Sequence, residues 1–144
     1  MTDSDLRHTL ALLAVGGIGP VSAKNLIAHA GSAEAVFRLP RGKLMAVPGI
    51  GPKAAEALLS GKAHARADQE IERLHQRGID VLGHTDLAYP ENLKTIYDAP
   101  LLLYKQGGAD LNAQPNIAIV GTRKPSAYGL DAARTFAQFF ASAG

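Results

Sequence analysis

The sequence contains no cysteine in its 144 residues, which excludes disulfide bonds, thiolate metal sites and a catalytic thiol. A secretory signal is also missing, because the first residues are acidic and no long apolar core follows them. No apolar run approaches the ~20 residues that a membrane-spanning helix needs. These absences predict a cytoplasmic protein with no membrane contact.

Groups suited to catalysis are scarce as well. The histidines at positions 8, 29, 64, 75 and 84 show no metal-ligand spacing, and Glu70 and Glu72 fall on different faces of a predicted helix. The glycine loops contain neither G-x-G-x-x-G nor the Lys-Ser/Thr ending of a P-loop. We therefore predict no catalytic residue, no metal ion and no cofactor.

An excess of one charge is missing too. The formal net charge is +2, and the composition of 47% hydrophobic and 19% charged residues is typical of a globular chain. Residues 1–61 carry six basic against four acidic residues, residues 62–100 five against seven, and residues 101–144 four against two. Any anion site must therefore be local and use backbone N–H groups as well as charge.

What the sequence does contain near its start is a repeat. Residues 15–20 (VGGIGP) recur as residues 47–52 (VPGIGP), and flanking apolar positions match at the same offset. Each copy predicts two helices joined by a tight turn, in which glycine tolerates positive φ and proline starts the second helix. We expect the isoleucine between the glycines to be buried.

Further helices are expected around this repeat. The first runs from about residue 4 to residue 14 with Asp3 or Ser4 as its N-cap, and Ser32 caps a short helix at 33–39. A polar helix at 62–77 is expected to turn Ala65, Ile71 and Leu74 inward.

Both copies of the repeat resemble the helix-hairpin-helix motif, in which hairpin N–H groups and the start of the second helix face a DNA phosphate. Free N–H groups at a helix start form an anion site. Secondary DNA contacts are therefore predicted at Gly17, Gly19, Lys24, Gly49, Gly51 and Lys53. Similar helical domains of the sterile-alpha-motif (SAM) type contact proteins, and for this domain we favour a structural or protein-binding role over DNA contact.

The pattern changes at residue 79, where short apolar runs replace helical spacing. Runs at 79–82, 101–104 and 117–120 predict strands, and continuous apolar strands are typical of a parallel sheet covered on both faces. The sequence thus predicts an α+β chain. An all-α helix-hairpin-helix/SAM-like domain at 1–78 is followed by the beginning of a Rossmann-like α/β domain at 79–144.

A glycine loop joins the last predicted strand to a helix that starts at about 126 or 130 and ends near 143. The loop begins Gly121-Thr122-Arg123-Lys124, and ligands of open α/β sheets bind at the carboxyl ends of strands. Loop N–H groups, the helix start and two adjacent cations favour an anion there. An ordinary solvated turn is the alternative. The helix residues expected to face the sheet are Leu130, Ala133, Phe136, Ala137 and Phe140.

Three strings occur in order: YPENL at 89–93, DAPLLLY at 98–104 and IAIVGTRKPSAYG at 117–129. Together they resemble the DprA/Smf family of DNA-processing proteins, which act in natural transformation. The resemblance implies single-stranded DNA binding at Gly121, Thr122 and Arg123, with Arg123 on a phosphate. Lys124, Ser126, Tyr128 and Gly129 complete the predicted site. Tyr128 either stacks on a base or packs under the loop, and we expect packing.

The resemblance also implies a homodimer that protects incoming DNA and loads the recombinase RecA, with the RecA-contacting region beyond this sequence. The family's Rossmann-like domain continues past residue 144, so we expect an incomplete sheet with exposed apolar edges. The alternatives are a Rossmann-like nucleotide-processing enzyme and a pure protein-interaction module. Phosphate binding weakens steeply with salt, which distinguishes it from an apolar protein contact.

Overall fold

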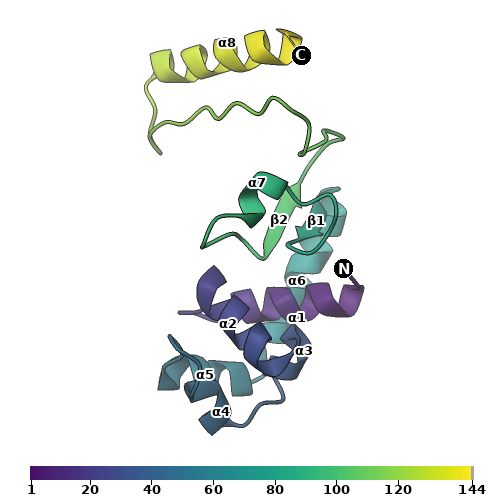
Figure 1. The fold of residues 1–144 in the computed structure, drawn as a ribbon, viewed down its shortest axis with the longest axis vertical. Helices are drawn as coiled ribbons and strands as arrows, with labels where there is room; N and C mark the ends of the chain where they lie inside the picture. Colours follow the sequence, from purple (N-terminus) through teal and green to yellow (C-terminus); the bar gives the residue numbers. More distant parts are fainter. Residues whose placement is uncertain (144) are drawn as a thin grey trace. The chain divides into compact units, whose positions relative to one another are not determined.

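The computed structural model describes residues 1–143, which fall into two compact units, Met1–Asn112 and a second unit that begins at Ala113 (Figure 1). The helices of the first unit are α1 (Asp3–Leu13), α2 (Pro20–Ala30), α3 (Ala33–Val36), α4 (Arg41–Met45), α5 (Pro52–Leu59) and α6 (Lys62–Gln76). It continues with β1 (Asp80–Gly83), α7 (Glu91–Lys94) and β2 (Leu102–Lys105). The second unit contains α8 (Ala127–Ala143). The fold is α+β, as the sequence predicted.

The positions that the two repeat copies share form the core of the first unit. Ile18 and Ile50, between the glycines, each retain 6% exposure, so their predicted burial is confirmed. Three matched pairs around them are buried: Leu12 with Leu44, Ala23 with Ala55, and Leu26 with Leu58. Each copy offers one apolar face that it cannot cover alone, and the copies cover each other in a single cluster.

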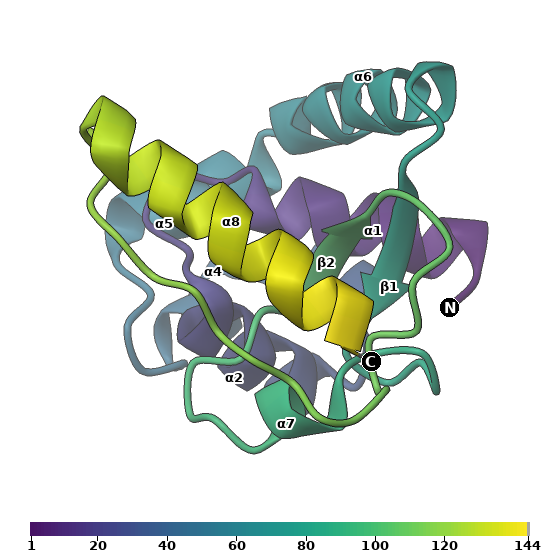
Figure 2. The same cartoon turned by 90° about the horizontal axis from the view of Figure 1, so that it is seen from above.

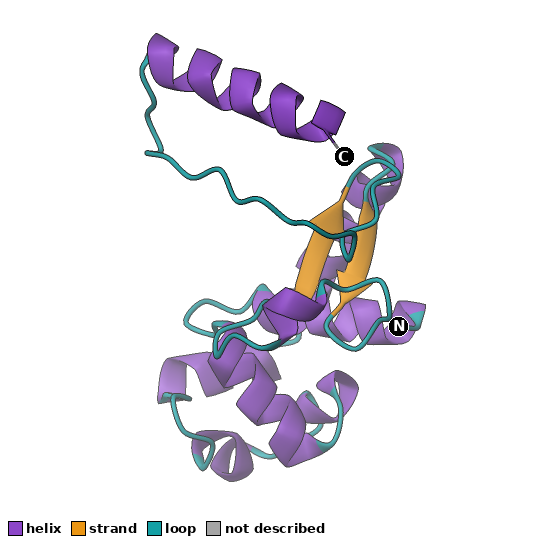
Figure 3. Ribbon diagram, turned by 45° about the horizontal axis from the view of Figure 1, so that its top comes forward, coloured by secondary structure: helices purple, strands orange, loops and turns teal. Residues whose placement is uncertain are grey.

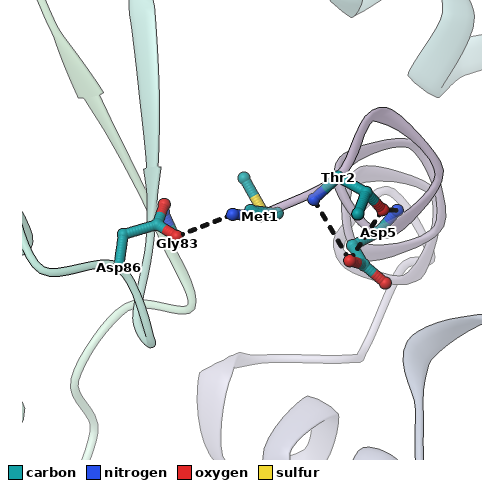
Figure 4. A network of polar contacts seen from close by, with 5 residues as sticks. All are labelled: Met1, Thr2, Asp5, Gly83 and Asp86. Carbon is teal, nitrogen blue, oxygen red and sulfur yellow. Dashed lines mark hydrogen bonds and ion pairs between the residues drawn. The ribbon is translucent and has the colours of Figure 1, made fainter.

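The N-cap of the first helix lies one residue before Asp3 and two residues before Ser4, the two predicted caps. Thr2 is the N-cap of α1, because its hydroxyl accepts from Asp5 N while the Asp5 carboxylate accepts from Thr2 N (Figure 4). These two reciprocal bonds satisfy more orphan donors than a single cap at Asp3 or Ser4 would. In α3 the expected cap is confirmed, since the Ser32 hydroxyl accepts from Ala35 N at 3.1 Å.

Helix α6 packs against α1. Its inward face carries Ala63, Ala67 and Leu74, and Ile71 is half-buried. Ala65 is exposed, contrary to expectation, because it lies about half a turn away from that face. Arg7 of α1 donates to both carboxylate oxygens of Asp68, at 2.5 and 2.8 Å, and this pairing lowers the pKa of Asp68.

The small sheet pairs β1 with β2 in antiparallel order, with Asp80 opposite Lys105 and Gly83 opposite Leu102 (Figure 2). Both strands lie where expected, but the predicted parallel arrangement is wrong for this pair. Parallel strands need a crossover across the sheet. Here the chain instead turns back between the two strands. Tyr89 is fully buried, and its hydroxyl donates to Pro100 O at 2.7 Å, which holds the segment before β2 near the end of β1.

Asp86 stabilises the turn that follows β1 through two hydrogen bonds. One carboxylate oxygen accepts from Gly83 N at 2.7 Å, and the other accepts from the amine of Met1 at 2.9 Å (Figure 4). These two bonds lower the pKa of the Asp86 carboxyl, with the amine as the larger cause. The start of α1 is thereby joined to the sheet.

The compact units divide at Asn112, whereas the expected boundary between sequence domains lies at residue 78. The reason is that the sheet packs with the helices: Leu101 and Leu102 contact the helical core. The Asn112 side chain links the end of this unit to the segment around α7, because it accepts from Glu91 N at 2.9 Å and donates to Tyr89 O at 3.3 Å.

Residues 117–120 form no strand in the structure, contrary to expectation, and the chain from β2 to α8 is loop (Figure 3). A strand exists only through its ladder, and the second unit provides no partner strand among its described residues. For the same reason no described α8 residue is buried, and the predicted sheet-facing positions have no sheet to cover. Ile117 and Ile119 instead line a groove of about 510 Å³ with Ala137 and Phe140. A Rossmann-like sheet stays a prediction.

Candidate nucleic-acid interface

The two hairpin turns have the same geometry. Gly17 and Gly49 both adopt a φ of +86°, a conformation that glycine tolerates best. Ile18 N donates to Val15 O at 3.2 Å, and Ile50 N donates to Val47 O at 3.1 Å. The second glycine of each turn, Gly19 or Gly51, is extended and serves as the N-cap of the next helix. Only the first glycine therefore needs the left-handed conformation.

Helices α2 and α5 begin alike. Each has glycine at the N-cap and proline in the first turn, and no side chain caps either one. The N–H groups of the first turn are therefore not satisfied by a capping side chain, and the positive end of the helix dipole lies beside them. Both hairpins have the donors that an anion requires.

The surroundings distinguish the hairpins. A Cβ at Gly49 would lie 3.0 Å from Ser22 Oγ, whereas one at Gly17 would meet nothing within 4 Å. The second turn is thus packed against α2, and the first is open. Lys53 is exposed at the start of α5, as a DNA contact requires. Lys24 is half-buried, and its charge contributes to the lowered pKa of His84, after the larger effect of burial.

In the second unit, Gly121, Thr122, Arg123 and Lys124 are all exposed. Neither cation forms an ion pair with a carboxylate of residues 1–143. The nearby Asp131 pairs with Arg134 at 3.6 Å. Two unneutralised cations therefore stand shortly before the amino end of a long helix, where the dipole also favours an anion.

Three further predicted site residues, Ser126, Tyr128 and Gly129, lie at or near the start of α8. The Ser126 hydroxyl accepts from Gly129 N at 3.2 Å, and Leu130 N donates to Ser126 O at 3.0 Å. Ser126 and Gly129 thus shape the start of α8. Tyr128 retains 83% exposure, so the expectation that it packs under the loop is wrong, because nothing in the second unit covers it. Its ring is accessible for base stacking.

One group of basic residues was not predicted from the sequence. These residues follow one another at spacings of four, seven and four, which places Lys62, Arg66 and Arg73 on one side of α6 and Arg77 at its C-cap. That spacing was available in the sequence. Two of these arginines, Arg66 and Arg73, line a groove together with Tyr104 of β2. Only the tertiary structure brings the arginines and the tyrosine together.

The structure offers no group of three or more metal-ligating side chains within its described residues. None of the described helices is long and apolar enough to cross a membrane. His84 Nε2 is buried and lacks a hydrogen-bond partner among residues 1–143, and burial lowers the pKa of this imidazole.

Comparisons with known proteins find similarities in both parts of the chain. Residues 80–144 match the family of DNA recombination-mediator protein A, and residues 9–62 match the SAM-like helix-hairpin-helix tandem. DNA processing protein DprA of Bacillus subtilis (strain 168) is 42% identical over 60 residues, which cover 41% of this chain and 20% of that protein. DNA processing protein DprA of Streptococcus pneumoniae (strain ATCC BAA-255 / R6) is 48% identical over 44 residues, covering 31% and 16%.

The chain is therefore similar to DprA-family proteins, and the family match lies on residues 80–144. The matched segments span about a fifth or less of the length of these two relatives. No solved structure matches the chain. The expected resemblance to the DprA family and the helix-hairpin-helix motif are both confirmed, and the loop from Gly121 to Gly129 lies inside the family match.

Proposed function

We propose that the protein binds single-stranded DNA by its phosphates, with Gly121, Thr122 and Arg123 as the main contact. The observation that carries this proposal is the exposed pair Arg123 and Lys124, which lacks a carboxylate partner among the described residues and precedes α8. Arg123 binds a phosphate through its guanidinium. Thr122 donates its hydroxyl to the same anion, and loop N–H groups add further donors.

Lys124 adds charge, Tyr128 provides a stacking surface, and Ser126 with Gly129 holds the helix start that positions the loop. The helix-hairpin-helix turns supply secondary contacts. Gly17 and Gly19 offer the more open turn, and Gly51 and Lys53 offer the more basic one.

The family resemblance supports a wider role, in which the protein processes DNA in natural transformation, protects the incoming strand and loads RecA as a homodimer. This role is a binding function, and no catalytic step is assigned to it. RecA filament formation on single-stranded DNA, with and without the protein, tests the loading role. Hydrolysis of a nucleotide by the purified protein would favour the enzymatic alternative.

The binding proposal is tested by the affinity of the protein for fluorescent oligo-dT across a salt series. We expect Arg123→Ala to weaken binding and to reduce the salt slope by about 0.7, the value for one phosphate contact on a single strand. The matched control is Arg134→Ala, which removes an exposed arginine from α8. Unchanged affinity and slope for Arg123→Ala would refute the proposed contact.

A further inference from the structure

Helix α6 carries its charges in a segregated pattern. Its buried face is formed by Ala63, Ala67 and Leu74. The basic side, which flanks that face, consists of Lys62, Arg66 and Arg73 together with Arg77 at the C-cap. Asp68 and Glu72 lie on the other side of the helix, where Asp68 is already bound by Arg7. Only Arg73 of the four cations has a carboxylate partner within residues 1–143, namely Glu70 at 3.6 Å.

The basic side of α6 opens into a groove of about 340 Å³, which we call the α6 groove. Its lining includes Arg66, Glu70 and Arg73 from α6, Leu10 and Leu13 from α1, and Tyr104 from β2. Arg66 Nη1 donates to Ala14 O at 3.3 Å, so the groove begins beside the first hairpin turn. All these residues belong to the first unit.

Tyr104 gives the groove an aromatic surface. It retains 54% exposure although it lies on β2 among apolar neighbours. Partial burial and the nearby Glu70 carboxylate raise the pKa of its hydroxyl, so the ring stays neutral at physiological pH. An exposed tyrosine that lines the same groove as two arginines combines the two elements of single-strand binding surfaces, an aromatic surface for stacking and a row of cations.

We propose that the α6 groove is a second binding surface for single-stranded DNA, in which Arg66 and Arg73 contact phosphates and Tyr104 stacks on a base. The inference rests on the proposed function for the nature of the ligand, but it concerns different residues on a different unit. From Lys62 to Arg77 the cations extend over about 22 Å, enough to follow a few nucleotides of backbone. The open turn at Gly17 continues this track at the Arg66 end.

Glu70 is the one acidic side chain in the groove, and it sets a further expectation. It pairs with Arg73 and thereby reduces the charge available to DNA. Glu70→Gln frees Arg73 and removes a repulsive charge, so we expect it to strengthen binding of oligo-dT about two- to threefold at low salt. A gain of binding does not arise from misfolding.

The main test compares oligo-dT binding by the protein and by Arg66→Gln/Arg73→Gln across a salt series. We expect affinity to fall about tenfold at low salt and the salt slope to decrease by about 1.4, the value for two phosphate contacts. Tyr104→Leu is expected to weaken binding about fivefold without changing the slope, and Tyr104→Phe is expected to keep it.

The matched control is Arg38→Gln/Arg41→Gln. Like the tested variant, it removes two arginines. Arg38 is exposed and paired with Glu34, and Arg41 is exposed and has no carboxylate partner in residues 1–143. An equal loss in the control would show a net-charge effect and overturn the α6 groove. Unchanged binding in the arginine and Tyr104→Leu variants would overturn it as well.

Arg123→Ala measured beside these variants separates the two proposals. Loss of binding in Arg123→Ala alone would support the proposed function and refute the α6 groove. Loss only in the α6 variants would do the reverse. If the unaltered protein bound no oligo-dT, both would fall.

Discussion

The two compact units contain similar apolar side chains and bury them very differently. Leu12, Leu26 and Leu44 in the first unit are fully buried, whereas Phe136 and Phe139 in the second keep 56% and 63% exposure. The helical repeat closes its own core, because each copy supplies the surface that the other needs. An apolar strand and its helix need further strands on both sides, and such partners do not lie within the described second unit.

The difference also concerns function. In the first unit the candidate DNA contacts stand on a packed core that fixes the turns at Gly17 and Gly49. In the second unit the Gly121 loop is held by the Ser126 cap and by the start of α8. Binding geometry is therefore better defined on the helical side, although the charge of the Gly121 loop is the more accessible.

The largest expected contrast comes from truncating one side chain in each unit. Leu12→Ala should lower the free energy of unfolding by about 3 kcal/mol, because it opens a cavity in a closed core. Phe136→Ala should change it by less than about 0.5 kcal/mol, as is usual for an exposed position. Urea unfolding followed by circular dichroism measures both. A similar cost for the two would mean that α8 is covered in solution.

A second contrast sharpens the comparison of the hairpins within the first unit. Gly17→Ala should cost about 1 kcal/mol, since alanine is strained at a φ of +86°. Gly49→Ala should cost about 2 kcal/mol, because its Cβ would also press on Ser22 Oγ. Thermal unfolding checks the pair. In a Ser22→Ala background the two costs should become equal, and a persistent difference would contradict the role of Ser22.

A smaller effect is expected at the start of α8. Ser126→Ala removes the acceptor of Gly129 N and should destabilise this helix end by about 1 kcal/mol. Since the loss is confined to the second unit, helical content should fall while the unfolding midpoint of the first unit stays constant. Hydrogen exchange at the amides of residues 129–131 is the direct measurement, and unaltered protection there would exclude the cap.

The smallest effect is a pH dependence that belongs to the first unit. The pKa of His64 is lowered, first by burial and then by Arg7 and His8. The unfolded chain takes up a proton near the ordinary value of 6.5 and the folded chain only at lower pH, so stability is complete above 6.5 and is lost as the pH falls below it. His84 has the same sign.

We expect His64→Gln to reduce this loss, and the residual loss to come from His84. The measurement is the shift of the unfolding midpoint between about pH 7.5 and about pH 5.5, compared for the protein and the variant. An identical shift in both would show that His64 is not the responsible group.

Local sequence signals predicted most of the first unit. Glycine spacing fixed both hairpins, and the shared apolar positions of the repeat indicated the core. The register of α6 was wrong only at Ala65, because alanine carries little information about which way it faces. The cap at Thr2 was missed because the reciprocal Asp5 bond extends the helix by one residue.

The sequence predicted which residues belong to the candidate DNA site, but it did not predict what each side chain does there. The loop from Gly121 to Lys124 is exposed as expected. The Ser126 hydroxyl, however, accepts the hydrogen bond that caps the helix, and Tyr128 is exposed to solvent. Neither feature follows from residue type, since serine caps and binds equally well, and an aromatic ring is buried only where something covers it.

The sequence by itself determined the repeat, the turns, the starts of α2, α3 and α5, and the family resemblance, because each depends on residues close together in the chain. Only the tertiary structure decided the antiparallel pairing of β1 and β2, the contact between Gly49 and Ser22, and the meeting of Tyr104 with Arg66 and Arg73. These features join residues that are far apart in the sequence, and packing selects such partners. Residues 117–120 give the converse case, because an apolar run becomes a strand only where a neighbouring strand supplies its hydrogen bonds.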